Sequence, residues 1–422
     1  MIEASGPAGG LEDGSGTWAL RPNHRSGSIA TPAWNRKTST EGSPVTSGPA
    51  RVGIIGAGTI SSIYLENSKK LDAFDITAIA DLRIDGAQKR AEDFGVSKAC
   101  GVDDLLSDPD VDLVINLTPH RVHGKVGIQV LEAGKHVYNE KPLSVHREDG
   151  QRMLAIAKDK GLRVGGAPDT FFGGAWQTAR ALIDRGVIGE PVGAFANLHA
   201  RPNSNRRRRP GGAAPQPGYT SFYATDYFEF GGGAIFDRGP YYLNALIHLL
   251  GPFVRVAGLN RITWPKREHG ENILDVKVPT HATASLEYAN GAICTFLMSN
   301  DIYETGLPHI EIYGSEGSLR CIDPNNFGGD LLLRRPDSPD LEPVPNEFGY
   351  TGNSRGVGVA DLCRAITNDR PQRAHGDMAY HVVDIINSVL ESSDSGELKV
   401  LESTCAQPAP LPANLSDWTI TD

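Results

Sequence analysis

The sequence predicts an α/β protein in which a doubly wound parallel sheet is followed by an α+β domain with a large, mostly antiparallel open sheet. Three observations predict this fold. An apolar strand at Arg51–Ile55 runs into a glycine-rich turn and a helical pattern. Apolar strands and helical patterns then alternate to about residue 168, which is typical of a parallel sheet. Beyond this point, strands follow one another through turns, as in antiparallel sheets.

The first fifty residues differ in composition from the rest of the chain. They are rich in Gly, Ser, Thr and Pro and show neither helical nor strand periodicity. A segment of this kind does not bury enough apolar surface to fold. We therefore expect a disordered tail at 1–50, a first domain at 51–168 and a second domain at 169–422, a division that suits a chain of 422 residues.

The first strand and helix enclose the turn Gly-Ala-Gly-Thr-Ile-Ser at 56–61, before a helix predicted at 62–70. Gly56 permits the tight turn, and Gly58 lets backbone N–H groups approach a pyrophosphate at the positive end of the helix. Ser61 occupies the place of the usual third glycine and is small enough for helix and strand to pack closely. The unit predicts a Rossmann-type dinucleotide site with Gly56, Gly58, Thr59 and Ile60 as cofactor contacts.

An acidic residue supports this prediction. The buried strand predicted at 75–80 ends at Asp81, which follows Gly56 by 25 residues. A carboxylate at this place accepts a hydrogen bond from the ribose 2′-hydroxyl of NAD and repels the 2′-phosphate of NADP. Arg83 offsets part of that repulsion, so NAD is the expected cofactor and NADP remains an alternative.

The remaining strands of the first domain lead to the same edge of the sheet. Helices are predicted at 85–94, 124–133 and 147–160, and strands at 111–117, 136–139 and 163–166. Ligands of such sheets bind outside the carboxyl ends of the strands. We therefore expect Gly56–Ser61, Asp81, Thr118–His123 and Glu140–Pro142 to converge there, with Thr118, Pro119, His123, Glu140 and Lys141 as further cofactor contacts.

The second domain begins with a helix at 176–185 and a strand at 192–200. The pair Asn290-Gly291 separates two apolar strands, at 282–288 and 292–299, and predicts a hairpin with a type I′ turn. Helices at 356–368 and 378–393 complete the chain. One face of the sheet should lie open to substrate or to another subunit, so we expect a homodimer or homotetramer.

Charge and composition exclude several classes of function. A net charge of −10 argues against nucleic-acid binding, which requires a basic face. Five dispersed cysteines suit reduced thiols in the cytoplasm, and no metal site is expected. No run of about 18 apolar residues predicts a membrane span. Four consecutive arginines, Arg206–Arg209, could bind a phosphorylated substrate, but we interpret them as a solvated, mobile loop.

These motifs resemble the Gfo/Idh/MocA oxidoreductase family, the group of glucose-fructose oxidoreductase and inositol dehydrogenase. The resemblance extends from Arg51 to the last helix. It rests on the cofactor turn, on the strand-end motif Asn116–His123 with its Thr-Pro pair, and on Glu140-Lys141-Pro142. A glycine run followed by Asp237 matches a fourth family element, although Tyr241 stands where the family has histidine. The resemblance places a substrate between Lys141 and Asp237.

The chemistry of alcohol oxidation leaves two assignments open. A proton must leave the hydroxyl as hydride departs, and a base with a near-neutral pKa does this best. Tyr241 serves if the Lys141 cation stabilises its phenolate, an effect of roughly 4 kcal/mol at about 4 Å and a dielectric constant of about 20. Alternatively Lys141 is the base, its pKa lowered by burial, and Asp237 accepts a substrate hydroxyl. We expect Lys141 and Asp237 to be essential and Tyr241 to contact the substrate.

Each candidate also has a purely structural interpretation. Asp237 could cap the helix that begins near Gly239, and Tyr241 with Tyr242 could be core aromatic residues of that helix. His123 could bind the backbone instead of the cofactor.

The expected activity is that of an NAD-dependent dehydrogenase or reductase acting on a secondary hydroxyl of a sugar, polyol or glycoside. Two other functions remain open. A redox-neutral enzyme would oxidise a sugar, eliminate its glycosidic group and reduce the product again. A cofactor-sensing regulatory protein would keep the fold without catalysis, and the missing histidine favours it, whereas the intact Lys141 and Asp237 argue against it.

Overall fold

The computed structural model describes residues 48–199, 220–269, 272–338, 340–413 and 415–421. The predicted tail, up to residue 47, and the four arginines Arg206–Arg209 lie outside the described residues. In the described part of the chain no helix combines the length and the apolar composition needed to cross a membrane.

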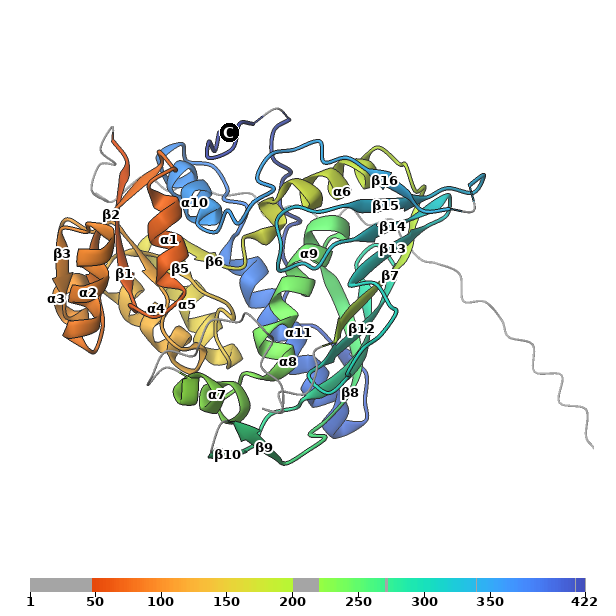
Figure 1. Cartoon of the computed structure of the whole chain (residues 1–422), viewed down its shortest axis with the longest axis horizontal. Helices are drawn as coiled ribbons and strands as arrows, with labels where there is room; N and C mark the ends of the chain where they lie inside the picture. The colour runs from red at the N-terminus through yellow and green to blue at the C-terminus, as the bar shows by residue number, and fades with distance from the viewer. Residues whose placement is uncertain (1–47, 200–219, 270–271, 339, 414, 422) are drawn as a thin grey trace, which may run out of the picture. The chain divides into compact units, whose positions relative to one another are not determined.

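Six parallel strands form the first sheet, in the order β3-β2-β1-β4-β5-β6 (Figure 1). Because the order reverses between β1 and β4, the crevice beside the carboxyl end of β1 is the expected ligand site of such a sheet. The strands are β1 Ala50–Ile55, β2 Phe74–Ala80, β3 Lys98–Cys100, β4 Leu113–Asn116, β5 His136–Asn139 and β6 Val164–Gly166.

Successive residues of these strands enter different cores. Ile54 and Ile115 belong to one cluster of buried side chains, whereas their neighbours Ile55 and Val114 belong to another. Both faces are therefore covered, as the unbroken apolar strands predict. The sequence pattern does not predict β3 and α3, which are only three and five residues long. The helices are α1 Ser61–Ser68, α2 Ile84–Phe94, α3 Val102–Leu106, α4 His123–Glu132 and α5 Arg147–Lys160, with a short 3₁₀ segment, η1, at His120–Val122.

The second sheet has nine strands in the order β16-β15-β14-β13-β7-β12-β11-β8-β17, and a separate ribbon joins β9 to β10. Only β7 and β12 run parallel, so the sheet is mostly antiparallel, as predicted. Its strands are β7 Pro191–His199, β8 Phe253–Arg261, β11 His281–Tyr288, β12 Ile293–Ser299, β13 Ile310–Gly314, β14 Gly317–Cys321, β15 Leu331–Arg334, β16 Glu342–Val344 and β17 Lys399–Val400, and the ribbon comprises β9 Lys266–His269 and β10 Asn272–Asp275.

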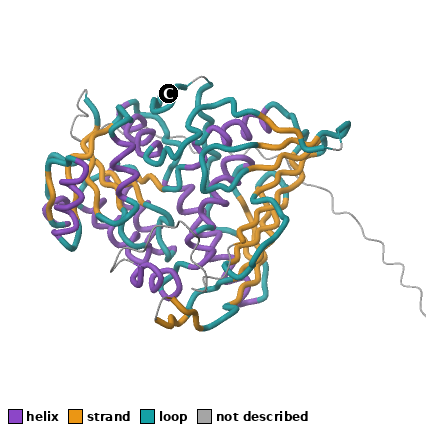
Figure 2. The backbone as a smooth tube through the Cα atoms, in the orientation of Figure 1, coloured by secondary structure: helices purple, strands orange, loops and turns teal. Residues whose placement is uncertain are grey.

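Helices cover one face of the second sheet (Figure 2). In β11, Ala282, Ala284 and Leu286 are buried, whereas the alternate side chains face outward. On the outer face Leu259 and Ile293 remain more than half exposed. The helices are α6 Gly174–Asp184, α7 Thr220–Glu229, α8 Gly233–Asp237, α9 Gly239–Leu250, α10 Val357–Thr367 and α11 Gly376–Ser395, with a second 3₁₀ segment, η2, at Thr170–Phe172. Helix α7 corrects the sequence-based expectation of one long loop from Arg201 to Phe230, because residues 220–229 of that segment are helical.

The hairpin between β11 and β12 is confirmed, but its turn is not the predicted type I′. Of the two central residues only Gly291 has a positive φ, +90°. Gly291 N–H donates to the Tyr288 carbonyl, and Tyr288 N–H donates to the Ala292 carbonyl. This loop of three residues corresponds to a type I turn followed by a left-handed glycine. The Asn290 amide binds the Leu250 carbonyl at 3.2 Å, a contact with the end of α9 that the local sequence does not reveal.

The C-terminal helices connect the two sheets. Gly165 of β6 pairs with His375 just before α11, and Arg147 of α5 forms an ion pair with Asp384 of α11 at 2.6 Å. Asp169, which follows β6, is buried and accepts hydrogen bonds from Gly356 N and Gly358 N at 2.8 and 3.1 Å. These contacts draw the loop before α10 towards the first sheet.

Asp169 generates a prediction about stability. Burial is the main cause that raises the pKa of its carboxyl from 3.8 to about 6, against the opposing effect of the two backbone N–H groups. A raised folded-state pKa contributes stability that is complete below the unfolded value and is lost as pH rises through about 6. Replacing Asp169 with Asn should remove this loss, which amounts to about 3 kcal/mol. Urea unfolding from pH 4 to 7 measures it, and parallel curves for variant and wild type would contradict the prediction.

Candidate active site

The glycine-rich turn has the geometry that a dinucleotide site requires. Gly56 has φ of +109°, and a Cβ at this position would stand 2.7 Å from the Leu117 carbonyl oxygen. Any side chain here would therefore clash with the backbone after β4. Gly58 has open space around its Cβ position, so its backbone stays accessible. Thr59 precedes Ile60, the N-cap residue of α1, and no side chain caps this helix.

Two backbone N–H groups hold the Asp81 carboxylate, one in the glycine-rich turn and one just after Asp81 itself. Its Oδ2 accepts a hydrogen bond from Ala57 N at 2.8 Å, and its Oδ1 accepts one from Arg83 N at 2.9 Å. The acid at the end of β2 is therefore fixed directly beside the glycine-rich turn. This arrangement leaves lone pairs of both oxygens for a ribose hydroxyl.

The loop after β4 is fastened by His123. The ring of this buried residue lies 2.7 Å from the Pro142 carbonyl through Nδ1 and 2.6 Å from the Thr118 carbonyl through Nε2. Burial is the main cause that lowers the pKa of His123. Thr118 Oγ1 donates to Asn116 Oδ1 at 2.7 Å, and Pro119 is the N-cap residue of η1. The His123 ring thus joins the Thr118 loop to the Lys141 loop through two backbone carbonyls. This agrees with the alternative in which His123 binds the backbone instead of the cofactor.

Glu140 is buried directly after β5, and both of its carboxylate oxygens accept hydrogen bonds. Its Oε1 accepts a hydrogen bond from the Tyr64 hydroxyl at 2.9 Å, and its Oε2 accepts one from Lys141 N at 2.8 Å. The bond from Tyr64 joins α1 to the segment that carries Lys141. The cofactor turn and the lysine are therefore coupled by one short chain of contacts.

Lys141 and Asp237 form an ion pair that joins the two domains. Lys141 Nζ lies 2.7 Å from Asp237 Oδ1 and 2.8 Å from the Asp237 carbonyl oxygen. The two side chains are 14% and 18% exposed. Burial alone raises the pKa of Asp237, but the Lys141 ammonium, with help from Arg238 and His120, outweighs it and holds the pKa below its ordinary value. Asp237 does not cap α9, because Arg238 is the N-cap residue and no side-chain bond caps that helix.

Tyr241 lies beside this pair on the first turn of α9. Lys141 Nζ is 5.2 Å from the centroid of its ring, and the Arg238 guanidinium carbon is 5.9 Å away. Tyr241 is buried, and its side chain is near enough to the Arg355 guanidinium to help raise the pKa of that arginine. The neighbouring Tyr242 points elsewhere and its hydroxyl lies 2.8 Å from His309 Nδ1. The structure therefore brings Lys141, Asp237 and Tyr241 together.

Several residues near the site were not identified from the sequence. Arg355 precedes α10, more than a hundred residues after Tyr241, and no local motif marks it. His120 lies 3.0 Å from the Asp226 carbonyl oxygen, and Arg121 forms an ion pair with the Asp226 carboxylate at 2.8 Å. These two contacts join η1 to α7. The contact of Tyr64 with Glu140 was not predicted from the sequence, because an aromatic residue inside a helix is usually a core residue.

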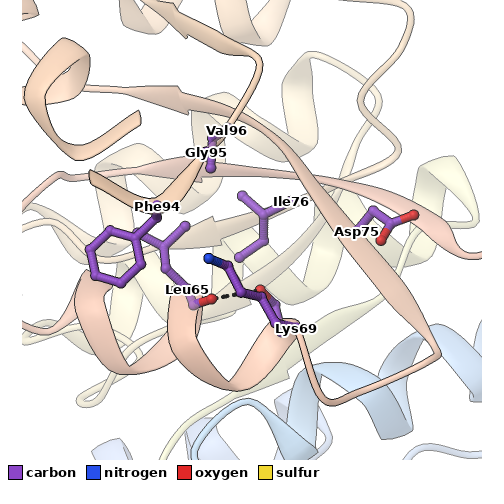
Figure 3. A pocket seen from close by; sticks show the side chains of 8 residues that line it. Leu65, Lys69, Asp75, Ile76, Phe94, Gly95 and Val96 are labelled. Atoms are coloured by element: carbon purple, nitrogen blue, oxygen red, sulfur yellow. Dashed lines mark hydrogen bonds between the residues drawn. The ribbon is translucent and has the colours of Figure 1, made fainter. Parts of the chain in front are cut away.

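A separate hollow of about 160 Å³ lies between α1, β2 and the end of α2. Figure 3 shows Leu65, Lys69, Ile76 and Phe94 around it, and Asp75 at its side. Asp75 is near the start of β2, whereas Asp81 follows its end. The hollow therefore belongs to the opposite edge of the sheet from Lys141 and Asp237.

Comparison with known proteins agrees with this fold. Residues 50–166 match the model of an oxidoreductase family with an NAD-binding Rossmann fold, and residues 176–320 match the GFO/IDH/MocA C-terminal domain. The fold and the site together define an oxidoreductase with a dinucleotide-binding domain and a second, sheet-containing domain. The chain belongs to the Gfo/Idh/MocA family, as its motifs indicate.

Among curated relatives, the 3-reductase of dTDP-3,4-didehydro-2,6-dideoxy-α-D-glucose from Streptomyces violaceoruber is 31% identical over 70% of this chain and 80% of its own length. Myo-inositol 2-dehydrogenase from Thermotoga maritima is 27% identical over 64% of this chain and 74% of its own length. A solved levoglucosan dehydrogenase, in complex with NADH and levoglucosan, has a TM-score of 0.72 and 20% identity, and the match covers 84% of this chain and all of that one. The solved structure shares the fold.

Replacement of Asp81 by Ala should weaken NADH binding, because a bond from ribose to a carboxylate is lost. Hydrogen bonds to charged groups contribute about 1.5–3 kcal/mol, so affinity should fall roughly tenfold to a hundredfold. Titration of NADH fluorescence measures the change. Affinity for NADPH should fall less or rise, and an equal loss for both cofactors would contradict the assignment of Asp81 to the ribose.

Proposed function

We propose that the protein transfers hydride between a nicotinamide cofactor, NAD, and a secondary hydroxyl or ketone carbon of a sugar, polyol or glycoside. The observation that carries the proposal is the Lys141–Asp237 ion pair beside Tyr241, where the carboxyl ends of the first sheet meet α8 and α9. Three polar groups of different chemistry thus lie close together, after the strand that follows the predicted cofactor contacts of the Thr118 loop. Alcohol oxidation requires such a set, because a proton and a hydride leave adjacent atoms.

Each group has a separate role in the proposed reaction. The cofactor, bound over Gly56–Ser61, supplies the hydride acceptor. Lys141 places its ammonium where the substrate oxygen gains negative charge and stabilises that charge. Asp237 holds the ammonium with two oxygens, and its free lone pairs can accept a second substrate hydroxyl. Tyr241 takes the hydroxyl proton.

Two features support Tyr241 over Lys141 as the proton acceptor. A carboxylate 2.7 Å from Lys141 Nζ favours the ammonium form, which has no lone pair to accept a proton. Tyr241 instead has a hydroxyl oxygen with lone pairs that can accept a proton, and its ring lies 5.2 Å from Lys141 Nζ. The residue in the position of the family histidine would then keep the proton-transfer role with a different side chain.

The substrate class and the preference for NAD have separate support. The 2-dehydrogenase from Thermotoga maritima acts on myo-inositol, a polyol, by its name, and the 3-reductase from Streptomyces violaceoruber acts on a nucleotide-linked deoxysugar. The oxygen-rich site of this chain suits polyhydroxylated molecules of that kind. Asp81, fixed beside the turn, would bind a ribose diol and repel a 2′-phosphate.

Replacement of Lys141 by Met should reduce turnover roughly a hundredfold to a thousandfold, because the developing negative charge loses its cation. NADH binding should change less than about tenfold, since Met retains the length of the side chain. A panel of sugars, polyols and glycosides, assayed by NADH absorbance, measures turnover. Lys125→Met, which removes an exposed lysine from α4, is the matched control.

Full activity of Lys141→Met on a substrate that the wild type oxidises would contradict the role of Lys141. Product formation without net NADH accumulation would indicate the redox-neutral reaction instead. NAD binding without turnover across the panel would favour a regulatory protein.

A further inference from the structure

Helix α7 of the second domain contacts the loop that carries the predicted cofactor residues Thr118 and Pro119. The Asp226 carboxylate of α7 lies 2.8 Å from Arg121 Nε, and the Asp226 carbonyl oxygen lies 3.0 Å from His120 Nε2. Both partners belong to η1, which follows Pro119 directly. One residue of the second domain thus binds two neighbouring residues of the first domain.

The ion pair between Arg121 and Asp226 joins an exposed charge to a buried one. The Asp226 side chain is 4% exposed, whereas that of Arg121 is 39% exposed. A carboxylate withdrawn from water in this way is stable only beside a positive charge. The Arg121 guanidinium carbon also lies 5.4 Å from the ring centroid of Phe230, which follows α7 directly. Arg121 is therefore held at two positions by the same segment.

On its other side α7 is attached to the ribbon of β9 and β10, beside which it lies in Figure 1. Apolar side chains of the helix and of the ribbon segment form a separate small core, made of Tyr227, Phe228, Leu274 and Val276. The Asn300 amide donates a hydrogen bond to the Tyr227 hydroxyl at 2.7 Å. This attachment lies wholly within the second domain.

The two attachments of α7 differ in strength. Burial of apolar side chains fixes the helix to the ribbon without regard to salt. An ion pair with one partly exposed member is weaker and is screened by salt. The contact between α7 and η1 is therefore the one that opens more readily, and its opening frees the loop of Thr118 from the second domain.

We propose that Asp226 is a positioning residue, which holds η1 through Arg121 and His120 and thereby keeps the Thr118 loop in the position that retains bound cofactor. Release of the cofactor then requires this contact to open, so the ion pair slows release. The reacting groups keep their places, because Asp237 is bound separately by Lys141 at 2.7 Å. The inference rests on the cofactor site of the proposed function and not on its substrate.

The experiment measures the rate at which NADH leaves the protein, by stopped-flow fluorescence after displacement with excess NAD. Arg121→Gln and Asp226→Asn should each release NADH about threefold to tenfold faster, since the ion pair is lost. The double variant should be no faster than the faster single variant, because both substitutions remove one interaction. Arg121→Lys keeps the charge and should lie between Arg121→Gln and wild type.

Lys277→Gln is the matched control, because it removes an ion pair of α7 that stays within the second domain, between Lys277 Nζ and Glu229 Oε2 at 3.1 Å. Its release rate should equal that of wild type. A second readout needs no cofactor. Hydrogen exchange of the backbone amides at 120–126 should be faster in Arg121→Gln than in wild type and unchanged in Lys277→Gln, because η1 is less firmly held.

Unchanged NADH release in both single variants would overturn the role of Asp226, as would equal acceleration in Lys277→Gln. Faster release in Arg121→Gln but not in Asp226→Asn would also overturn it, because Arg121 would then bind the cofactor itself. If Asp226→Asn does not fold, Arg121→Gln and Arg121→Lys decide by release and exchange together. Failure of wild type to bind NADH would contradict the proposed function, whereas unchanged exchange at 120–126 would contradict only the hold of Asp226 on η1.

Discussion

The ion pair between Lys141 and Asp237 is the interaction on which the site depends. Each partner is withdrawn from most of the solvent, and a charge in such a place is stable only beside its opposite. Lys141 lies two residues after β5 of the first sheet, and Asp237 ends α8 of the second domain. The pair therefore forms only when the two domains are assembled, and the assembled pair leaves an ammonium and a carboxylate on one side of the predicted cofactor turn.

A second group of contacts makes this arrangement rigid. Glu140 accepts a hydrogen bond from the Tyr64 hydroxyl of α1, and the His123 ring at the start of α4 lies between two backbone carbonyls. The segment that carries Lys141 is therefore fixed from both helices. Asp169 draws the loop that carries Arg355 towards the first sheet through two backbone N–H groups. Side chains that perform no chemistry thus determine where the reacting groups stand, which is the usual requirement for a preorganised site.

The replacement of the family histidine by Tyr241 has an electrostatic counterpart in the structure. A neutral imidazole accepts a proton near neutral pH without help, whereas a phenol needs positive charge nearby. Two cations lie near the Tyr241 ring from different segments: Lys141 Nζ is 5.2 Å from the ring centroid, and the Arg238 guanidinium carbon is 5.9 Å from it.

The sequence by itself determined the class of fold and the residues whose roles are local. Gly56, Asp81 and Lys141 were identified because each stands at a strand end whose ligand geometry follows from the backbone, and their motifs resemble one family. Tertiary structure alone decided the rest. The turn after Tyr288 depends on contacts of Asn290 with α9, and β3 and α3 are too short to give a periodic signal. Tyr64, Arg238 and Arg355 reach the site from separate segments, and side-chain contacts across such distances in the chain leave no pattern in the local sequence.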